Sequence, residues 1–188
     1  MSNSYVADAR IVEEVQKALA KSLRKEPAAI RMDASVMDDL GGTSLDFLDM
    51  TFRLEQAFGV RMSHQTLLDT VEETYGEGKA IDADGALTAD AVTLLKMRLP
   101  GASSLEAGAF ADEVPKFVTP ETLANGVREI LAALPAACTH CGATAWGSAT
   151  GVKVACGACQ KDAVYPDGDA LTKAWLEGVS KEKHLFGA

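Results

Sequence analysis

The segment from Leu40 to Gly59 constrains the fold of this chain more than any other part of the sequence. A turn with two adjacent glycines, at residues 41–42, leads into a run with the apolar spacing of an amphipathic helix that begins near Ser44. Gly59 suits the left-handed conformation that ends a helix. Steps of mostly three and four residues predict one buried face, formed by Leu45, Leu48, Phe52, Leu54 and Phe58.

Ser44 stands at the start of this predicted helix, where two roles compete. A serine at a helix start commonly acts as the N-cap and accepts hydrogen bonds from backbone N–H groups that the first turn leaves without partners. Such caps are frequent, so the serine considered by itself favours this role. The alternative, an attachment site, depends on the surrounding segment.

That segment, from Asp39 to Gly59, resembles the acyl carrier protein family without a gap. In that family the pattern Asp-(Ser/Leu)-Gly-X-(Asp/Ser)-Ser-Leu-(Asp/Glu) marks the serine that receives 4′-phosphopantetheine. The resemblance implies that Ser44 is the attachment site and that the fold is a four-helix carrier bundle. It also implies that acidic side chains of the same helix recognise basic patches on partner proteins, through Asp46, Asp49 and Glu55.

The segment also departs from the family pattern. Thr43 stands where an acid or serine usually precedes the modified residue, and Gln56 and Ala57 replace acids that are common in fatty-acid carriers. Arg53 adds a positive charge to the same helix. These changes weaken the acidic face, and they leave open which transferase and which partner enzymes recognise the chain.

A carrier protein holds its cargo and does not itself turn it over. The resemblance implies that a phosphopantetheinyl transferase moves the arm from coenzyme A to Ser44, with Mg²⁺ supplied by that enzyme. The terminal thiol of the arm then holds an acyl group as a thioester for acyl-transferring or acyl-modifying enzymes. Fatty-acid, polyketide, aminoacyl or peptidyl and sugar-modifying pathways all use such carriers, and we expect a specialised lipid or secondary-metabolite pathway.

The charge of the chain limits its partners. With 27 acids against 18 bases the net charge is −9, which argues against nucleic acid and against anionic membranes. Residues 1–137 carry 22 acids and 13 bases, whereas residues 138–188 carry 5 of each. No export signal and no membrane-spanning stretch is visible, so we expect a cytoplasmic protein without membrane insertion, as a monomer.

The remaining helices follow from periodicity and capping residues. We expect helices from about Ala7 to Leu23, over residues 89–99, and from Pro120 with Thr119 as its N-cap. Residues 1–134 would then form the carrier domain, with an insertion around the third helix at about 66–116. Within the insertion, residues 82–85 suggest a calcium loop, but two ligand positions hold alanine, so a turn is expected.

The four cysteines form two Cys-x-x-Cys pairs separated by 14 residues, Cys138 with Cys141 and Cys156 with Cys159. This spacing is typical of a structural zinc site in which four thiolates surround the ion, and it resembles a zinc ribbon. Redox dithiols are the rival interpretation, but they occur singly and in a βαβ setting. We expect Zn²⁺ in a module at residues 138–188, with a β hairpin and an amphipathic helix over 169–179.

Two other functions remain to be weighed against the carrier. An enzyme would need a nucleophile with a base or an open metal site, and three scattered histidines with a closed four-cysteine site offer neither, so we expect no catalysis. In the other alternative Ser44 is never modified, and the zinc ribbon acts as a protein-interaction module. The overall expectation is a mainly α protein that consists of a carrier bundle and a small zinc ribbon.

Overall fold

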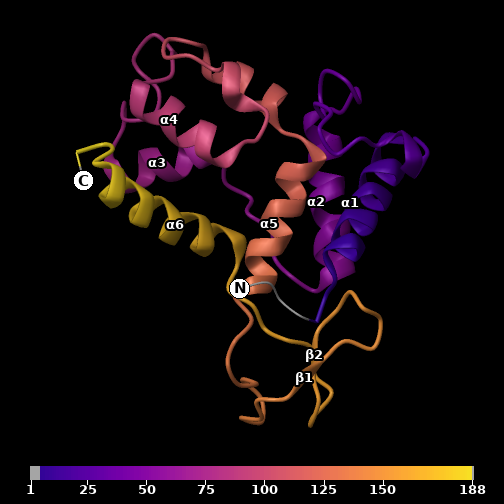
Figure 1. Ribbon diagram of the computed structural model, residues 1–188. Helices are drawn as coiled ribbons and strands as arrows, with labels where there is room; N and C mark the ends of the chain where they lie inside the picture. Colours follow the sequence, from indigo (N-terminus) through magenta and orange to yellow (C-terminus); the bar gives the residue numbers. More distant parts are fainter. Residues whose placement is uncertain (1–4, 188) are drawn as a thin grey trace.

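The computed structural model describes residues 5–187, and the outermost residues of the two predicted domains, 1–4 and 188, lie outside this range. The predicted mainly α fold with a small two-stranded sheet is confirmed (Figure 1). Its longer helices and its strands are α1 (Asp8–Leu23), α2 (Ser44–Phe58), α3 (Leu67–Tyr75), α4 (Ala89–Arg98), α5 (Pro120–Ala132), β1 (Trp146–Gly147), β2 (Ala155–Cys156) and α6 (Gly168–Lys183). Short 3-10 helices are η1 (Pro27–Ala29), η2 (Ala102–Ser104) and η3 (Ala111–Phe117).

Helix α1 packs against both α2 and α5, and the three helices contribute to the larger of two hydrophobic cores. The helix ends agree with the sequence signals, because Ala7 precedes α1 as its N-cap, Thr119 caps α5, and Pro120 is the first residue of α5. Thr119 Oγ1 accepts a hydrogen bond from the backbone N–H of Thr122. The largest fully buried side chains of this core include Leu19, Met50, Leu54, Phe58 and Leu131.

Only two of the five residues predicted to form the buried face of α2 are buried. Leu54 and Phe58 are buried, together with Met50, but Leu45, Leu48 and Phe52 are exposed. Residues two positions apart lie about 200° apart around a helix. Phe52 and Leu54 therefore lie on nearly opposite sides of the helix. The sequence contains two apolar stripes, and only the one formed by residues 50, 54 and 58 faces the core.

A second hydrophobic core lies between α3, α4 and α6 and joins α3 and α4 to the C-terminal helix. Leu68, Val71, Leu94, Leu95 and Leu176 are buried in it. The predicted helix at 89–99 is confirmed as α4, capped by Thr88 and ended before Pro100. Residues 82–85 form a turn, as expected, in which Asp82 Oδ1 accepts hydrogen bonds from the N–H groups of residues 84 and 86.

Arg98 connects three helices where the two cores meet. Its guanidinium forms an ion pair with both carboxylate oxygens of Glu129 on α5. The same guanidinium lies 5.0 Å from the ring centroid of Trp175 on α6. Because Arg98 is the last residue of α4, these contacts fix the C-terminal end of α4 to both α5 and α6.

The N-terminus of α6 docks tightly on the loop that follows α2. The N–H of Gly168 donates to the carbonyl of Arg61 at 2.9 Å. Asp169 Oδ1 accepts hydrogen bonds from Ser63 Oγ at 2.6 Å and from the N–H groups of His64 and Gln65. Burial tends to raise the pKa of Asp169, but these hydrogen bonds outweigh it and lower the pKa. The carboxylate form therefore holds α6 in place.

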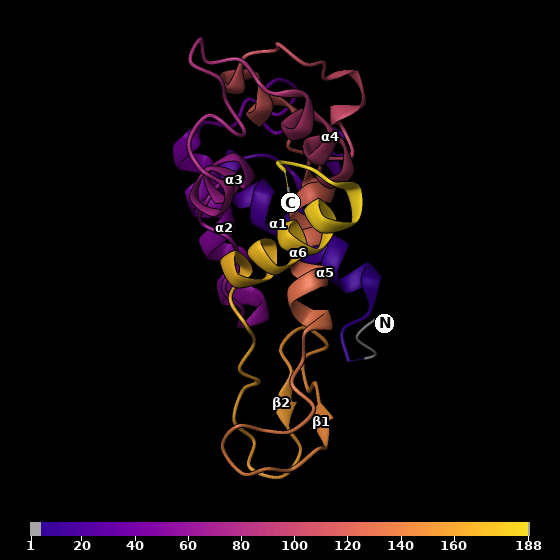
Figure 2. The same ribbon diagram turned by 90° about the vertical axis from the view of Figure 1, so that its left-hand side faces the viewer.

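The predicted helix at 169–179 is present as the longer α6, and it packs against α3 and α5. The hairpin is also present, although its strands are shorter than expected: Trp146 pairs with Cys156 and Gly147 with Ala155, in antiparallel register. This ribbon projects from one end of the bundle of α1, α2 and α5 (Figures 1 and 2). Among the helices within residues 5–187, none has the length and apolar character needed to cross a bilayer.

Gly168 provides a test of the α6 docking. A Cβ atom at this position would lie 2.3 Å from the backbone nitrogen of Ser63. Because this clash is with the backbone, rotation of a side chain cannot remove it. We expect Gly168→Ala to lower the free energy of unfolding by about 1–3 kcal/mol, measured by urea denaturation. Gly178→Ala is the matched control, because a Cβ there meets no atom within 4 Å, and it should stabilise the helix by up to about 1 kcal/mol. Equal stability of both variants would contradict the docking.

Candidate functional site

The turn before Ser44 is held in a single geometry by the two glycines. Gly41 has φ of +72°, in the left-handed region that favours glycine. Gly42 approaches the backbone so closely that a Cβ atom would lie 2.8 Å from the carbonyl oxygen of Val36. Its N–H donates to that same oxygen, and the N–H of Val36 donates to the carbonyl of Val118, just before α5. The start of α2 is therefore fixed to the rest of the bundle.

Thr43, and not Ser44, is the N-cap of α2. Thr43 Oγ1 accepts a hydrogen bond from the N–H of Asp46, and Asp46 Oδ2 accepts from both the N–H and the hydroxyl of Thr43. These hydrogen bonds lower the pKa of Asp46 and keep it ionised. The capping role that a serine here would otherwise take is thus filled by its neighbour.

Ser44 is consequently the first residue of α2 and is exposed. Within residues 5–187 its hydroxyl makes no hydrogen bond, ion pair or other polar contact. The first turn of a helix presents N–H groups and the positive end of the helix dipole, which favour a negative charge. An exposed hydroxyl in this position can accept a phosphate ester without breaking any interaction of the folded chain.

The three acids that were predicted to recognise partners are each engaged within the chain. Asp46 belongs to the cap, and Asp49 Oδ2 accepts hydrogen bonds from Ser22 Oγ at 2.6 Å and Arg53 Nε at 2.7 Å. These two donors lower the pKa of Asp49. Glu55 Oε1 accepts from the N–H of Met62 and lies 3.1 Å from His64 Nε2. The recognition role of these three acids stays a prediction.

Sequence reasoning missed the apolar surface beside Ser44. Leu45 is 77% exposed, Leu48 63% and Phe52 57%, and all three lie on the side of α2 that faces away from the core. Large apolar side chains gathered on one solvent-facing side of a helix commonly mark an interaction site. The sequence contains a signal for this surface. Residues 50, 54 and 58 are spaced by four and form a second apolar stripe that can be buried in place of the stripe at 45, 48 and 52.

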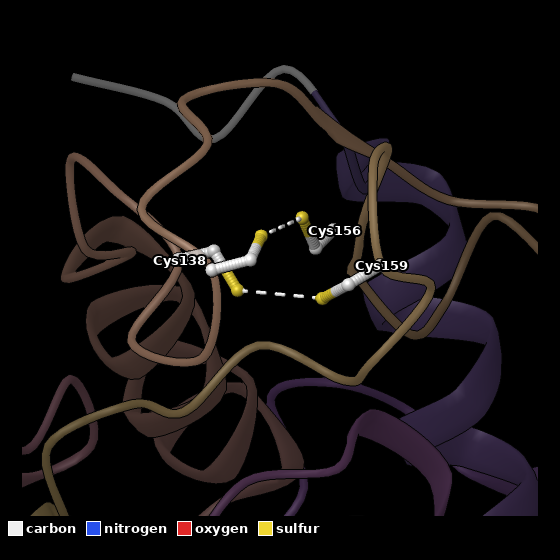
Figure 3. A group of neighbouring side chains, drawn as sticks. Cys138, Cys156 and Cys159 are labelled. Atoms are coloured by element: carbon white, nitrogen blue, oxygen red, sulfur yellow. Dashed lines mark hydrogen bonds between the residues drawn. The ribbon is translucent and has the colours of Figure 1, made fainter.

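The four cysteines converge in the ribbon, where all four sulfur atoms lie within 4.8 Å of one another. Cys138 Sγ lies 3.7 Å from Cys159 Sγ, and Cys141 Sγ lies 3.6 Å from Cys156 Sγ (Figure 3). Each short distance therefore joins one Cys-x-x-Cys pair to the other. These distances exclude disulfides, whose sulfurs are about 2.05 Å apart.

The same distances suit zinc. A tetrahedral ion with Zn–S bonds of about 2.3 Å places its sulfurs about 3.8 Å apart, close to the separations in this cluster. The N–H groups of Cys159 and Ala158 point at Cys156 Sγ and lower the pKa of this thiol to about 6. The N–H of Ala143 acts in the same direction on Cys141, but the neighbouring sulfurs prevail and raise its pKa to about 12. A bound cation would remove this conflict.

The serine and the cysteines are well separated. The C-cap of α2, Gly59, lies against the side chain of Lys153 in the ribbon, with closest approaches of 3.8–3.9 Å to the position of an added Cβ. Ser44 is at the other end of the same helix, about 21 Å away at 1.5 Å per residue. The ribbon therefore leaves the surroundings of Ser44 open.

Comparisons with known proteins show which proteins the segment around Ser44 is similar to. Residues 13–76 match the family model described as "Phosphopantetheine attachment site". The acyl carrier protein of Campylobacter hominis is 33% identical over 52 residues, which cover 28% of this chain and 66% of that relative. That of Exiguobacterium sibiricum is 39% identical over 51 residues, 27% of this chain and 65% of the relative. The matches thus span just under two thirds of these relatives, and no solved structure matches the chain.

The predicted resemblance to acyl carrier proteins is confirmed for this segment, and with it the cofactor class, 4′-phosphopantetheine. The match covers α1 from Glu13 onward, the turn, α2 and α3. It ends before α4 and does not reach the cysteines. The four clustered cysteines can hold a metal ion such as zinc.

Metal content provides a direct test of the cysteine cluster. We expect about one zinc per chain by elemental analysis, because four thiolates complete a tetrahedral shell. Cys138→Ser should reduce the zinc content by more than half, since its sulfur bridges to the second pair. His140→Ala is the control, because His140 lies between two ligands in sequence but is exposed and outside the cluster. A large loss of zinc from His140→Ala would contradict the four-cysteine site.

Proposed function

We propose that residues 1–134 form a carrier domain in which Ser44 bears the 4′-phosphopantetheine arm, and that residues 138–188 form a module in which Cys138, Cys141, Cys156 and Cys159 bind zinc. The observation that supports the carrier domain is that capping of α2 is done by Thr43 and not by Ser44. Thr43 makes the cap, which leaves the exposed hydroxyl of Ser44 without a structural duty. The match of residues 13–76 to the attachment-site family supports the same assignment.

Ser44 would act as an attachment point and not as a catalyst. A phosphopantetheinyl transferase, with its own Mg²⁺, transfers the arm from coenzyme A to Ser44 Oγ and forms a phosphodiester. The thiol at the end of the arm then carries an acyl group as a thioester. The exposed N–H groups of the first turn of α2 stabilise the phosphodiester charge. No group of the chain needs to supply catalysis for this function.

Partner enzymes would dock on the solvent-facing side of α2. Leu45, Leu48 and Phe52 offer apolar contact next to Ser44, and the ionised Asp46 and Asp49 border them. Charges at the edge of such a surface steer and orient a partner more than they add affinity. Glu55, which is engaged with the loop after α2, would shape this surface from its far end.

The zinc in the C-terminal module would be structural. Four thiolates fill a tetrahedral shell and leave no position for water or substrate. The cargo of the arm is an acyl group in this proposal, with an aminoacyl or peptidyl cargo as the alternative. A monomeric, cytoplasmic protein in a specialised lipid, fatty-acid or polyketide pathway fits the acidic charge and the added modules.

Modification of Ser44 is measurable by intact mass. Incubation with coenzyme A and a promiscuous phosphopantetheinyl transferase should add one phosphopantetheine per chain, and Ser44→Ala should abolish the gain. Ser103→Ala is the control, because Ser103 is also exposed but lies in η2, outside the matched segment. The absence of a mass gain with several transferases would leave the unmodified interaction module as the better proposal.

The docking surface has its own test. We expect Phe52→Ser to lower kcat/KM of the transferase at least about fivefold, because removal of a contacting aromatic ring from a docking surface costs about 1 kcal/mol or more. The melting temperature should hardly change, because Phe52 is 57% exposed. Phe110→Ser, at a residue that is 58% exposed in the insertion, is the matched control and should retain the kinetics. Equal effects of the two variants would contradict docking on α2.

A further inference from the structure

The ribbon shares its hydrophobic core with the carrier bundle. Val154 is 2% exposed, and Val152 and Ala163 are also buried. All three belong to the same core cluster as Met50 and Phe58 of α2, and Trp146 packs against that cluster from β1. The ribbon therefore contributes side chains to the interior of the domain that presents Ser44.

These core residues are placed directly between and after the cysteines. Val152 and Val154 lie between the two Cys-x-x-Cys pairs, and Ala163 follows the second pair. The N–H of Ala163 donates to the carbonyl of Val154 at 2.9 Å, and the N–H of Cys156 donates to the carbonyl of Lys161. The geometry that brings the four sulfurs together is therefore the geometry that presents the valines to the bundle.

The ribbon has little structure of its own to maintain this geometry. Its sheet consists of two strands of two residues each. A segment of roughly 30 residues with so short a sheet buries too little apolar surface to fold alone. Further links to the helical part include the hydrogen bond from Trp146 Nε1 to the carbonyl of Pro135, shortly after α5, and the side chain of Lys153, which lies beside Gly59. The docked residues Gly168 and Asp169 hold the chain after the ribbon to the loop that follows α2.

We propose that metal binding by the four cysteines stabilises the Ser44-bearing bundle itself, because the metal holds Val152 and Val154 in the bundle core. This inference rests on the proposed zinc site and goes beyond it, since an independent structural ribbon would fold and unfold without affecting the helices. Binding that occurs only in the folded state adds its free energy to that state. Here the stabilised state is the carrier domain, so metal loss destabilises its helices, including α2, whose C-terminal end lies beside the ribbon.

The test follows helix unfolding in the full chain with and without zinc, by far-ultraviolet circular dichroism under reducing conditions. Removal of zinc with a chelator should lower the melting temperature of the helical signal by roughly 6–24 °C, the loss expected when two buried valines leave a core in a chain of this size. The temperature should recover when zinc is added back. An unchanged helical transition after verified zinc removal overturns the proposal.

Two variants test whether zinc binding stabilises the helices through Val154. Val154→Ser should still bind about one zinc per chain, but zinc removal should then lower its melting temperature by less than half of the wild-type shift. Val164→Ser is the matched control, since this valine is in the same ribbon but 53% exposed, and it should keep the full shift. If Val154→Ser fails to fold, Val154→Ala replaces it. Zinc removal should then also lower the melting temperature by less than in the wild type, although the difference from the wild type should be smaller. The full wild-type shift in a folded Val154 variant overturns the proposal.

The readouts also distinguish this inference from the function on which it rests. Zinc content by elemental analysis tests the site, and the mass gain at Ser44 tests the carrier role, independently of the melting temperature. A chain that binds no zinc overturns both the site and the coupling. A chain that binds zinc and accepts phosphopantetheine, but melts identically without zinc, overturns the coupling alone.

Discussion

The burial of one side of α2 against α1 and α5 determines how the rest of the molecule is arranged. Met50, Leu54 and Phe58 are almost completely buried and fix the rotation of the helix about its axis. That rotation turns the opposite stripe, which contains Leu48 and Phe52, into solvent. An exposed apolar stripe costs solubility, so its retention beside an exposed serine is consistent with a surface that partners cover.

The two ends of α2 then acquire different tasks because they are terminated differently. At the N-terminus Thr43 and Asp46 satisfy each other's backbone N–H groups, which leaves the hydroxyl of Ser44 without a hydrogen bond among residues 5–187. At the C-terminus Gly59 takes the left-handed conformation with φ of +69° and lies against Lys153. The free end is thus suited to chemistry supplied by other proteins, and the covered end to a structural connection.

Local signals allowed much of this arrangement to be predicted from sequence. Thr119 followed by Pro120, and Thr88 before an apolar run, specify helix starts within a few residues, so α5 and α4 were found. The Cys-x-x-Cys spacing likewise predicted four clustered sulfurs. The role of Ser44 could not come from periodicity, since an isolated serine at a helix start indicates only a cap, and it required resemblance over the whole segment.

The features that were not predicted depend on contacts between distant parts of the chain. The rotation of α2 depends on a choice between two apolar stripes that both have helical spacing, and that choice is made by packing against other parts of the chain. Asp169 holds Ser63 from a position 106 residues further along the chain, and no pattern near either residue indicates this pair.

The position of the ribbon is the most consequential of these long-range features. From composition, the change from an acidic helical part to a neutral, cysteine-rich part favours two separate modules. Yet Val152 and Val154 complete the core beneath α2, at the end of the bundle of α1, α2 and α5 where apolar side chains such as Phe58 and Val60 also lie in that core. A short ribbon can cover them only if something other than its own sheet keeps it folded. The four sulfurs, at distances suited to one tetrahedral ion, are the part of the ribbon able to do so.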